Sequence, residues 1–200
     1  MAKLLIAPCD AKAARHAVMH WHYSKKMPIG RLLKYGIWED GQFIGAMVFG
    51  RGASSSYGHA FGLEHNEVCE LVRVAMTNHT TPVTRCIAIA VKQIKKTQQG
   101  LRLILSYADP DAGHTGTIYR AGAWVYLGLT GSETKYLVDG QWVHRREMVS
   151  GPFGKVRRYT QAQMDSFPSK KTAPKHKFGM ALDDEMQALL QTMKVDYHAP

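Results

Sequence analysis

The segment between residues 69 and 105 constrains the fold most, because it predicts two parallel strands joined by a helix. Residues 69–76 alternate between apolar and polar side chains, as expected of a strand. A helix is expected to begin at Thr81-Pro82 and to carry an apolar stripe on one face. Leu103-Ile104-Leu105 is a purely apolar run of the kind found in buried strands. Such a unit forms a right-handed crossover. The fold class that it indicates is α/β, in the form of an α+β protein with a mixed sheet.

Polar side chains follow directly after the apolar run at 103–105. Ligands bind at the carboxyl ends of strands in open α/β sheets, so this place is the first candidate for an active site. A short helix is expected within 115–122. The alternative, a polar loop whose Asp and Ser side chains cap a helix, carries equal weight on composition alone. The candidate side chains are Ser106, Tyr107, Asp109, Asp111, His114 and Tyr119.

The other elements are predicted from hydrophobic periodicity and turn residues. Asp10 suits the N-cap of a helix, and Asp40-Gly41 and Asp139-Gly140 are preferred turn pairs between hairpin strands. The long loop at 50–66 is expected to be functional or disordered. The expected elements are a strand at 3–7, a helix after Asp10, strands at 35–39 and 43–49, a strand at 124–129, hairpin strands at 136–138 and 141–143, and a helix at 182–193.

A formal net charge of +10 favours polyanionic partners such as nucleic acid. The composition shifts near residue 151, which predicts a main domain over 1–150 and a basic extension over 151–200 whose last helix packs on that domain. Charge alone does not choose among nucleic acid, an acidic membrane and phosphorylated cofactors. The basic side chains near and beyond the second hairpin are the candidates to hold phosphates, those of DNA if the partner is nucleic acid, and Tyr57 in the long loop is a candidate to contact a ligand or a base. These basic residues are Arg145, Arg146, Lys155, Arg157, Arg158, Lys170, Lys171, Lys175 and Lys177.

Cysteine usage and the lack of apolar targeting segments bound the compartment. Cys9, Cys69 and Cys86 show no Cys-x-x-Cys spacing and cannot all pair, which argues for a reducing compartment. The start of the chain has no signal-like apolar region, and no stretch is long enough to span a bilayer. We therefore expect a cytoplasmic protein that binds no membrane. His16 and His20 share a helix face. The residues between them include no Glu, so they do not form a zinc-protease motif.

The order of strands and helices resembles the acetyl-CoA-dependent N-acyltransferase (GNAT) fold. Particular residues go further and resemble the phage Mom family over nearly the whole chain, with 106–121 as the most specific part. The segments that carry this resemblance are His22-Tyr23, Glu70-Leu71-Val72-Arg73-Val74, Thr84-Arg85-Cys86-Ile87-Ala88, Ser106-Tyr107-Ala108-Asp109, the run from Gly113 to Ala121, and Pro174-Lys175-His176-Lys177-Phe178.

The resemblance implies an enzyme that converts the N6 amine of adenine in phage DNA to a methylcarbamoyl (acetamido) adduct, which protects the genome from host restriction. It also implies acetyl-CoA or another acyl-CoA-type donor, an iron centre, and a host-cell cytoplasmic location. By position, Ser106, Tyr107, Asp109 and Tyr119 would line the reaction centre. Arg73 and Arg85 would bind the cofactor, and His22, Tyr23 and Asp109 would belong to the metal site.

One departure from the GNAT pattern concerns cofactor binding. GNAT enzymes place a glycine-rich turn ahead of the central helix, whereas residues 76–85 contain no glycine. Close approach of the backbone to a pyrophosphate is harder without one. This counts against the first alternative, an ordinary GNAT acyltransferase acting on a small-molecule or protein amine. The density of polar groups at 106–119 counts against the second, a non-catalytic DNA-binding protein. The oligomeric state stays open, a dimer included.

Overall fold

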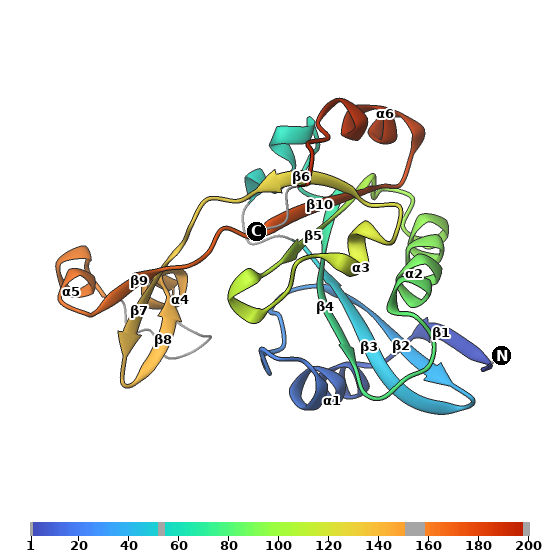
Figure 1. Cartoon of the computed structure of the whole chain (residues 1–200), viewed down its shortest axis with the longest axis horizontal. Coiled ribbons are helices and arrows are strands. Elements are labelled where there is room, and N and C mark those ends of the chain that lie inside the picture. The colour runs from blue at the N-terminus through green and yellow to red at the C-terminus, as the bar shows by residue number, and fades with distance from the viewer. Residues whose placement is uncertain (1, 52–54, 151–158, 198–200) are drawn as a thin grey trace.

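A computed structural model describes residues 2–51, 55–150 and 159–197 (Figure 1). Its elements are β1 (Leu4–Pro8), α1 (Ala11–Trp21), β2 (Leu32–Glu39), β3 (Gln42–Gly50), the 3₁₀ helix η1 (Ser55–Phe61), β4 (Val68–Met76), α2 (Val83–Thr97), β5 (Leu103–Ala108), the 3₁₀ helix η2 (Pro110–Ala112), α3 (Thr117–Arg120), β6 (Val125–Leu129), β7 (Thr134–Val138), β8 (Gln141–His144), α4 (Arg145–Ser150), α5 (Gln161–Asp165), β9 (Ser169–Lys171), β10 (His176–Ala181) and α6 (Asp184–Thr192). None of the described helices is both long and apolar enough to cross a bilayer.

The main sheet has seven strands in the order β1-β2-β3-β4-β5-β10-β6. Strands β4 and β5 pair in parallel, and the other neighbours pair antiparallel. The parallel pair joined by α2 confirms the predicted crossover unit. The mixed sheet likewise confirms the predicted fold class.

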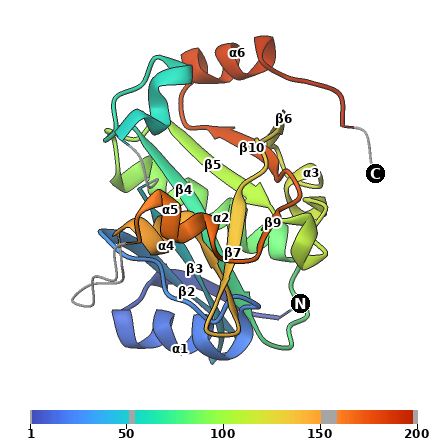
Figure 2. The same ribbon diagram turned by 90° about the vertical axis from the view of Figure 1, so that its left-hand side faces the viewer.

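Helices cover both faces of this sheet. On one face α1 packs its Ala14, Ala17 and Val18 on β3 and β4, and α6 packs beyond it on β10 and β6. On the other face the apolar stripe of α2 joins the largest core cluster. Figure 2 shows α1 and α6 at opposite ends of the sheet.

Local signals explain where several elements begin and turn. The Asp10 side chain accepts the backbone N–H of Ala13 and caps α1 as predicted. Asp40 and Gly41 have φ values of 50° and 82°, so the β2–β3 hairpin turns through the left-handed region that this pair favours. The second predicted hairpin is also present, as β7 and β8.

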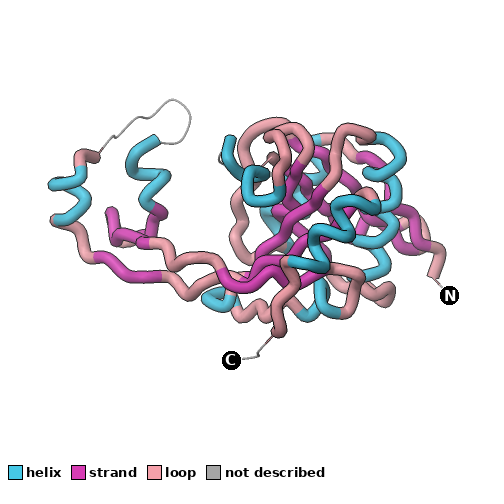
Figure 3. The backbone as a smooth tube through the Cα atoms, turned by 90° about the horizontal axis from the view of Figure 1, so that it is seen from above, coloured by secondary structure: helices cyan, strands magenta, loops and turns pink. Residues whose placement is uncertain are grey.

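A second, three-stranded sheet stands apart from the main body. Its strand order is β8-β7-β9, and a small cluster of Tyr136, Met148 and Met164 is its core. Figures 1 and 3 show this sheet with α4 and α5 projecting to one side, joined by two extended connections. We call the described residues within 134–171 the arm, and the connections 130–133 and 172–175 the neck.

The structure divides the chain differently from the sequence-based boundary at residue 150. The arm draws β7 and β8 from before that residue and β9 from after it. Strand β10, from the predicted extension, lies inside the main sheet between β5 and β6, with Phe178 fully buried. The run His176–Ala181 is basic and contains a glycine, so its composition does not predict a strand. Pairing with the two neighbouring strands, β5 and β6, holds its backbone in the sheet. Lys155, Arg157 and Arg158 lie outside the described residues.

Candidate active site

A cavity opens where β4 and β5 stop pairing. Their parallel register runs from Val68↔Leu103 to Glu70↔Leu105 and ends there. Beyond this point the strands separate, and a cavity of about 330 Å³ occupies the opening. Its walls come from the end of α1, from β4 and β5, from the segment 113–119 and from the neck. Its lining residues are His22, Tyr23, Glu70, Leu71, Val72, Arg73, Val74, Tyr107, Ala108, Asp109, Gly113, His114, Thr115, Gly116, Thr117, Ile118, Tyr119 and Lys175.

At the apex of the opening β4 and β5 no longer pair through their backbones, and a hydrogen bond from the Ser106 side chain links the two strands instead. Its hydroxyl lies 2.9 Å from the carbonyl oxygen of Leu71 and 2.7 Å from the hydroxyl of Tyr119. The carbonyl can only accept, so when Ser106 donates to it, Tyr119 donates to Ser106. When Ser106 donates to Tyr119 instead, the phenol proton is free for a group in the cavity. The buried Ser106 hydroxyl therefore controls where the Tyr119 proton points.

Tyr119 is held by an aromatic cluster behind the cavity. Its ring lies 5.1 Å from that of Trp124 and 5.0 Å from that of Phe178. Burial raises the pKa of Tyr119 to about 12, although its bond with Ser106 works in the opposite direction. The phenol consequently keeps its proton at neutral pH, which suits a proton donor.

Gly116 allows the Tyr119 and Phe178 rings to pack together. It has a φ of +77°, and a Cβ at this position would lie 2.4 Å from the Phe178 ring. The resulting turn starts α3, which carries Tyr119 to the apex. Only glycine meets both demands without strain.

Asp109 lies at the end of β5, on the cavity rim. One of its oxygens accepts the backbone N–H of Asp111 and so caps the 3₁₀ helix η2. The other lies 3.9 Å from the Lys175 ammonium, which also lies 3.7 Å from Glu133. Both neck connections thus meet the loop after β5 through Lys175.

Three rings gather on one wall of the cavity. The Tyr23 ring centroid lies 4.4 Å from that of His22 and 5.0 Å from that of His114. Burial, with the charges of Arg73 and His114, lowers the pKa of His22 to about 4. Burial and the carboxylate of Asp109 raise the pKa of Tyr23. Both side chains are therefore neutral at physiological pH.

The three predicted metal ligands share this cavity but are not arranged as an iron site. Nδ1 of His22 lies 3.1 Å from the backbone nitrogen and 2.9 Å from the hydroxyl oxygen of Ser24, so Ser24 already engages this ring nitrogen. Asp109 is engaged by a backbone N–H and faces an ammonium group. Within the described ranges, no three His, Cys, Asp or Glu side chains form a group that could hold a metal ion. The geometry gives the iron prediction no support.

Glu70 and Arg73 lie on the β4 side of the cavity. The Tyr57 hydroxyl donates to Glu70 at 3.1 Å, which places Tyr57 in the supporting wall. Arg73 donates to the carbonyls of Lys26 and Val72, and burial lowers the pKa of its guanidinium. Arg73 is thus a rigid cationic element beside Tyr23.

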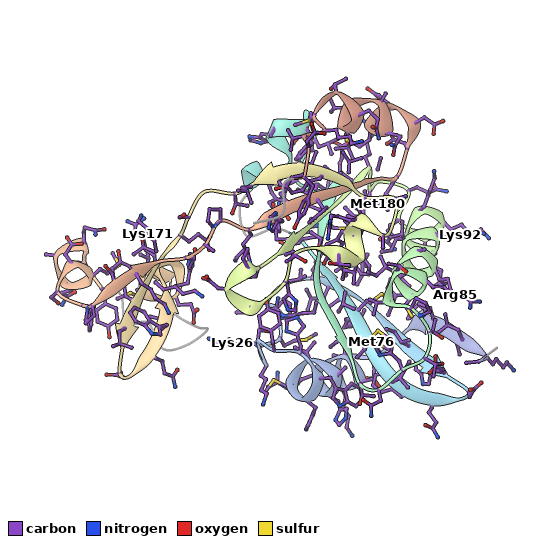
Figure 4. All side chains as sticks on the ribbon, viewed as in Figure 1. Lys26, Met76, Arg85, Lys92, Lys171 and Met180 are labelled. Atoms are coloured by element: carbon purple, nitrogen blue, oxygen red, sulfur yellow. The ribbon has the colours of Figure 1, made fainter. Side chains whose placement is uncertain are left out.

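Arg85, predicted to bind a cofactor phosphate, is exposed in the first turn of α2 and does not line this cavity (Figure 4). A second groove of about 280 Å³ runs between α2 and α3, lined mainly by apolar side chains and by Lys92 and Lys95, and Arg85 is not among its lining residues either. Ile118 lines both the groove and the cavity, so the two adjoin. Ahead of α2, the N–H groups of Thr80 and Thr81 bond to Glu39, a carboxylate cap that the sequence did not indicate.

The predicted DNA-contacting residues are distributed between the arm and the cavity. Arg145 is exposed at the start of α4, and Arg146 is the second residue of the same helix. Lys175 lines the cavity from the neck. The Lys177 ammonium lies over the Phe61 ring, where burial lowers the pKa of the lysine. Phe61 is buried beneath this contact and is not available to stack on a base.

Sequence reasoning did not assign a role to His114, although it stands in the segment singled out. Its ring partner Tyr23 is more than ninety residues away in the sequence. The link between Lys175 and Asp109 was also missed, because the lysine's basic neighbourhood suggested only phosphate contacts. No local pattern marks either contact.

Comparisons with known proteins agree with the geometry. A family model described as the Mom protein family matches residues 3–199. The chain is 25% identical over 169 residues to the protein named methylcarbamoylase mom from Escherichia phage Mu. This alignment covers 82% of this chain and 68% of the relative.

Solved structures resemble the fold. A spermidine/spermine N-acetyltransferase, SpeG from Vibrio cholerae, superposes with a TM-score of 0.52 at 9% identity, covering 93% of this chain and 96% of that one. An N-acetyltransferase from Staphylococcus aureus Mu50 gives a TM-score of 0.50 at 10% identity, covering 90% and 99%. At these identities the likeness shows the acetyltransferase-type fold alone, which confirms the predicted GNAT-like architecture.

Proposed function

The chain belongs to the Mom protein family, and from this premise we propose that it is a transferase that modifies phage DNA. The proposed reaction attaches a methylcarbamoyl (acetamido) group to N6 of adenine and so protects the DNA from host restriction. The single observation that carries the proposal is the cavity at the β4–β5 opening. Both the Asp109 carboxylate and the protonated Tyr119 phenol line this cavity.

The chemistry needs an acceptor and a donor of protons. Adenine N6 is a poor nucleophile because its lone pair is conjugated with the ring, and a duplex hides it. The base must therefore leave the stack to enter the cavity. Asp109 then orients N6 and accepts its proton, and Tyr119 donates to the leaving group. Ser106 supports the second step by taking the arrangement in which its own proton points to Tyr119.

The proposed group donor is of the acyl-CoA type. Acyl transfer from acetyl-CoA alone would give N6-acetyladenine, so forming the methylcarbamoyl adduct also requires a co-substrate that supplies the amide nitrogen. The groove between α2 and α3 meets the cavity at Ile118, so a donor lying in the groove could present its reactive end to the cavity. Arg85, exposed in the first turn of the helix α2 that forms one side of the groove, is proposed to hold a donor phosphate. Arg73 and Tyr107, in the cavity wall, are proposed to contact the reactive end of the donor and the substrate. These roles extend the resemblance to positions that the structure leaves accessible.

The arm is proposed to hold the DNA. The described residues of the arm contain five Lys or Arg against three Asp or Glu. Lys155, Arg157 and Arg158, which lie outside the described residues, bring the net charge of 134–171 to +5, half of the net charge of +10. A positive surface of this kind binds phosphates regardless of base sequence. The neck joins it directly to Asp109 through Lys175. DNA held on the arm would therefore lie beside the cavity.

Mass spectrometry of nucleosides from the plasmid DNA of cells that express the protein tests the proposal. We expect a deoxyadenosine that carries the added group, and none in cells with the empty vector. Unmodified DNA from cells with ample folded protein would contradict the proposal and favour an ordinary acyltransferase. That alternative predicts acetyl-CoA binding together with weak, salt-insensitive DNA binding.

A further inference from the structure

Tyr23, His22 and His114 form a feature that the proposed reaction does not yet use. The three rings come from two distant segments, the end of α1 and the loop before α3, and both segments line the cavity. The ring planes of His22 and Tyr23 are inclined by 31° and those of Tyr23 and His114 by 56°, at centroid distances of 4.4 and 5.0 Å. This is the spacing of stacked and tilted aromatic pairs, not of three ligands that converge on one point.

Tyr23 and His114 are the exposed members of the group, and His22 is buried. The His22 side chain is buried and held by Ser24 through its Nδ1. The Tyr23 side chain is 57% exposed although it lines the cavity. A flat ring at the cavity mouth, supported by a fixed ring behind it, offers a surface to a planar ligand at little cost in side-chain entropy.

The charges around the rings suit a neutral base with an exocyclic amine. The Asp109 carboxylate acts on Tyr23 electrostatically, which places it near the same ring. Arg73 also acts on Tyr23 and is fixed by two backbone carbonyls. A purine lying on Tyr23 would thus meet an acceptor for its amine and a cation for its ring nitrogens or its 5′-phosphate. The cavity, at about 330 Å³, falls in the range of small-ligand sites.

We propose that Tyr23, backed by His22 and His114, is the stacking platform that holds the extruded adenine with its N6 amine toward Asp109. The inference rests on the proposed function, because it names the subsite for that reaction's acceptor. It assigns Tyr23 a role for its ring face and none for its oxygen. A metal ligand or a proton carrier would need the oxygen.

The matched substitutions are Tyr23→Phe, which keeps the ring, and Tyr23→Ala, which removes it. The measurement is the fluorescence of 2-aminopurine, an adenine analogue, in duplex oligonucleotides with varied neighbouring bases, titrated with the purified full chain and no donor. Stacking of the extruded base changes the fluorescence without any transfer step. His20→Ala, an exposed ring bonded to its own helix carbonyl, is the control for general loss of an α1 side chain.

We expect Tyr23→Phe to stay within about threefold of the wild-type affinity and Tyr23→Ala to weaken base capture about tenfold or more, as loss of one stacked base implies. His20→Ala should match wild type. An equal loss in Tyr23→Phe and Tyr23→Ala would overturn the platform, because the hydroxyl would then be essential. Wild-type affinity in Tyr23→Ala would overturn it as well.

Failure of this inference can be told from failure of the proposed function. Base capture that depends on the Tyr23 ring, with no modified adenine in cells, would contradict the proposed reaction and support the platform. Modified adenine in cells, with base capture indifferent to Tyr23, would support the reaction and contradict the platform.

Discussion

The cavity and the arm place their polar groups in opposite ways. In the cavity, Ser106 and Tyr119 are buried, and each hydroxyl has a partner within hydrogen-bond distance. In the arm, Lys170 and Lys171 are exposed on a sheet with a core of three buried residues. Buried, bonded groups hold a fixed geometry, whereas exposed charges act over a longer range and tolerate movement. The difference indicates that the cavity fixes reacting atoms and that the arm captures a polyanion.

The largest expected effect sharpens this comparison on the cavity side. Tyr119→Phe removes the proposed proton donor and should lower the rate of adenine modification at least about 100-fold, the usual size of a general-acid contribution. DNA affinity should not change, since the arm is untouched. Tyr126→Phe is the matched control, because Tyr126 packs on the same Phe178 ring at 5.2 Å but does not line the cavity. Equal losses in both variants would show that packing and not proton transfer matters.

The next prediction concerns the rigidity of the cavity. Gly116→Ala places a Cβ against Phe178 at positive φ and should reduce the free energy of unfolding by about 2 kcal/mol or more. Gly113→Ala also has positive φ, at +76°, but meets no atom within 4 Å, so it should cost only about 1 kcal/mol. Denaturant unfolding measures both. A Gly116→Ala variant no less stable than Gly113→Ala would contradict the tight packing described here.

On the arm side, Lys170→Ala combined with Lys171→Ala should weaken duplex binding about tenfold at physiological salt and make the salt dependence shallower by about two charges. Modification at saturating DNA should stay near wild type. Removing two positive charges from α1 instead, with Lys12→Ala and Arg15→Ala, is the control. The comparison would break if both pairs weakened binding alike, because the whole surface and not the arm would then hold DNA.

The smallest expected effect lies outside both regions. Arg85→Ala should weaken acetyl-CoA binding about fivefold, roughly the 1 kcal/mol of an exposed charge contact. Titration calorimetry of the purified protein measures the dissociation constant. Lys3→Ala, also an exposed charge, is the control. Unchanged affinity in Arg85→Ala would remove this residue from the donor site.

The sequence predicted the central unit of the fold well, because its signals are local. The apolar run at 103–105, the stripe of α2 and the turn pair Asp40-Gly41 each act within a few residues. Strand β10 was missed, since its place is decided by pairing with β5 and β6, which lie about 50 to 75 residues away. Nothing within His176–Ala181 indicates that pairing.

The candidate site was found only in part, for the same reason. Ser106, Asp109 and Tyr119 belong to one stretch, and the structure brings all three to the β4–β5 opening. His22 and Tyr23 join them through tertiary packing that only the family resemblance anticipated. The side-chain roles inside the cavity depend on geometry. The contacts between Nδ1 of His22 and Ser24, which fix the orientation of this ring, cannot be seen in a sequence.

The central claim is that the cavity at the β4–β5 opening modifies adenine with Asp109 as the proton acceptor. Nucleoside mass spectrometry of DNA from cells expressing wild type, Asp109→Asn or Asp111→Asn tests it most directly. Asp111 lies on the same loop, contacts the neck through the N–H of Ala173 and does not line the cavity. We predict modified deoxyadenosine with wild type and Asp111→Asn, and none above background with equally folded Asp109→Asn. A normal yield of modified deoxyadenosine with Asp109→Asn would contradict the claim.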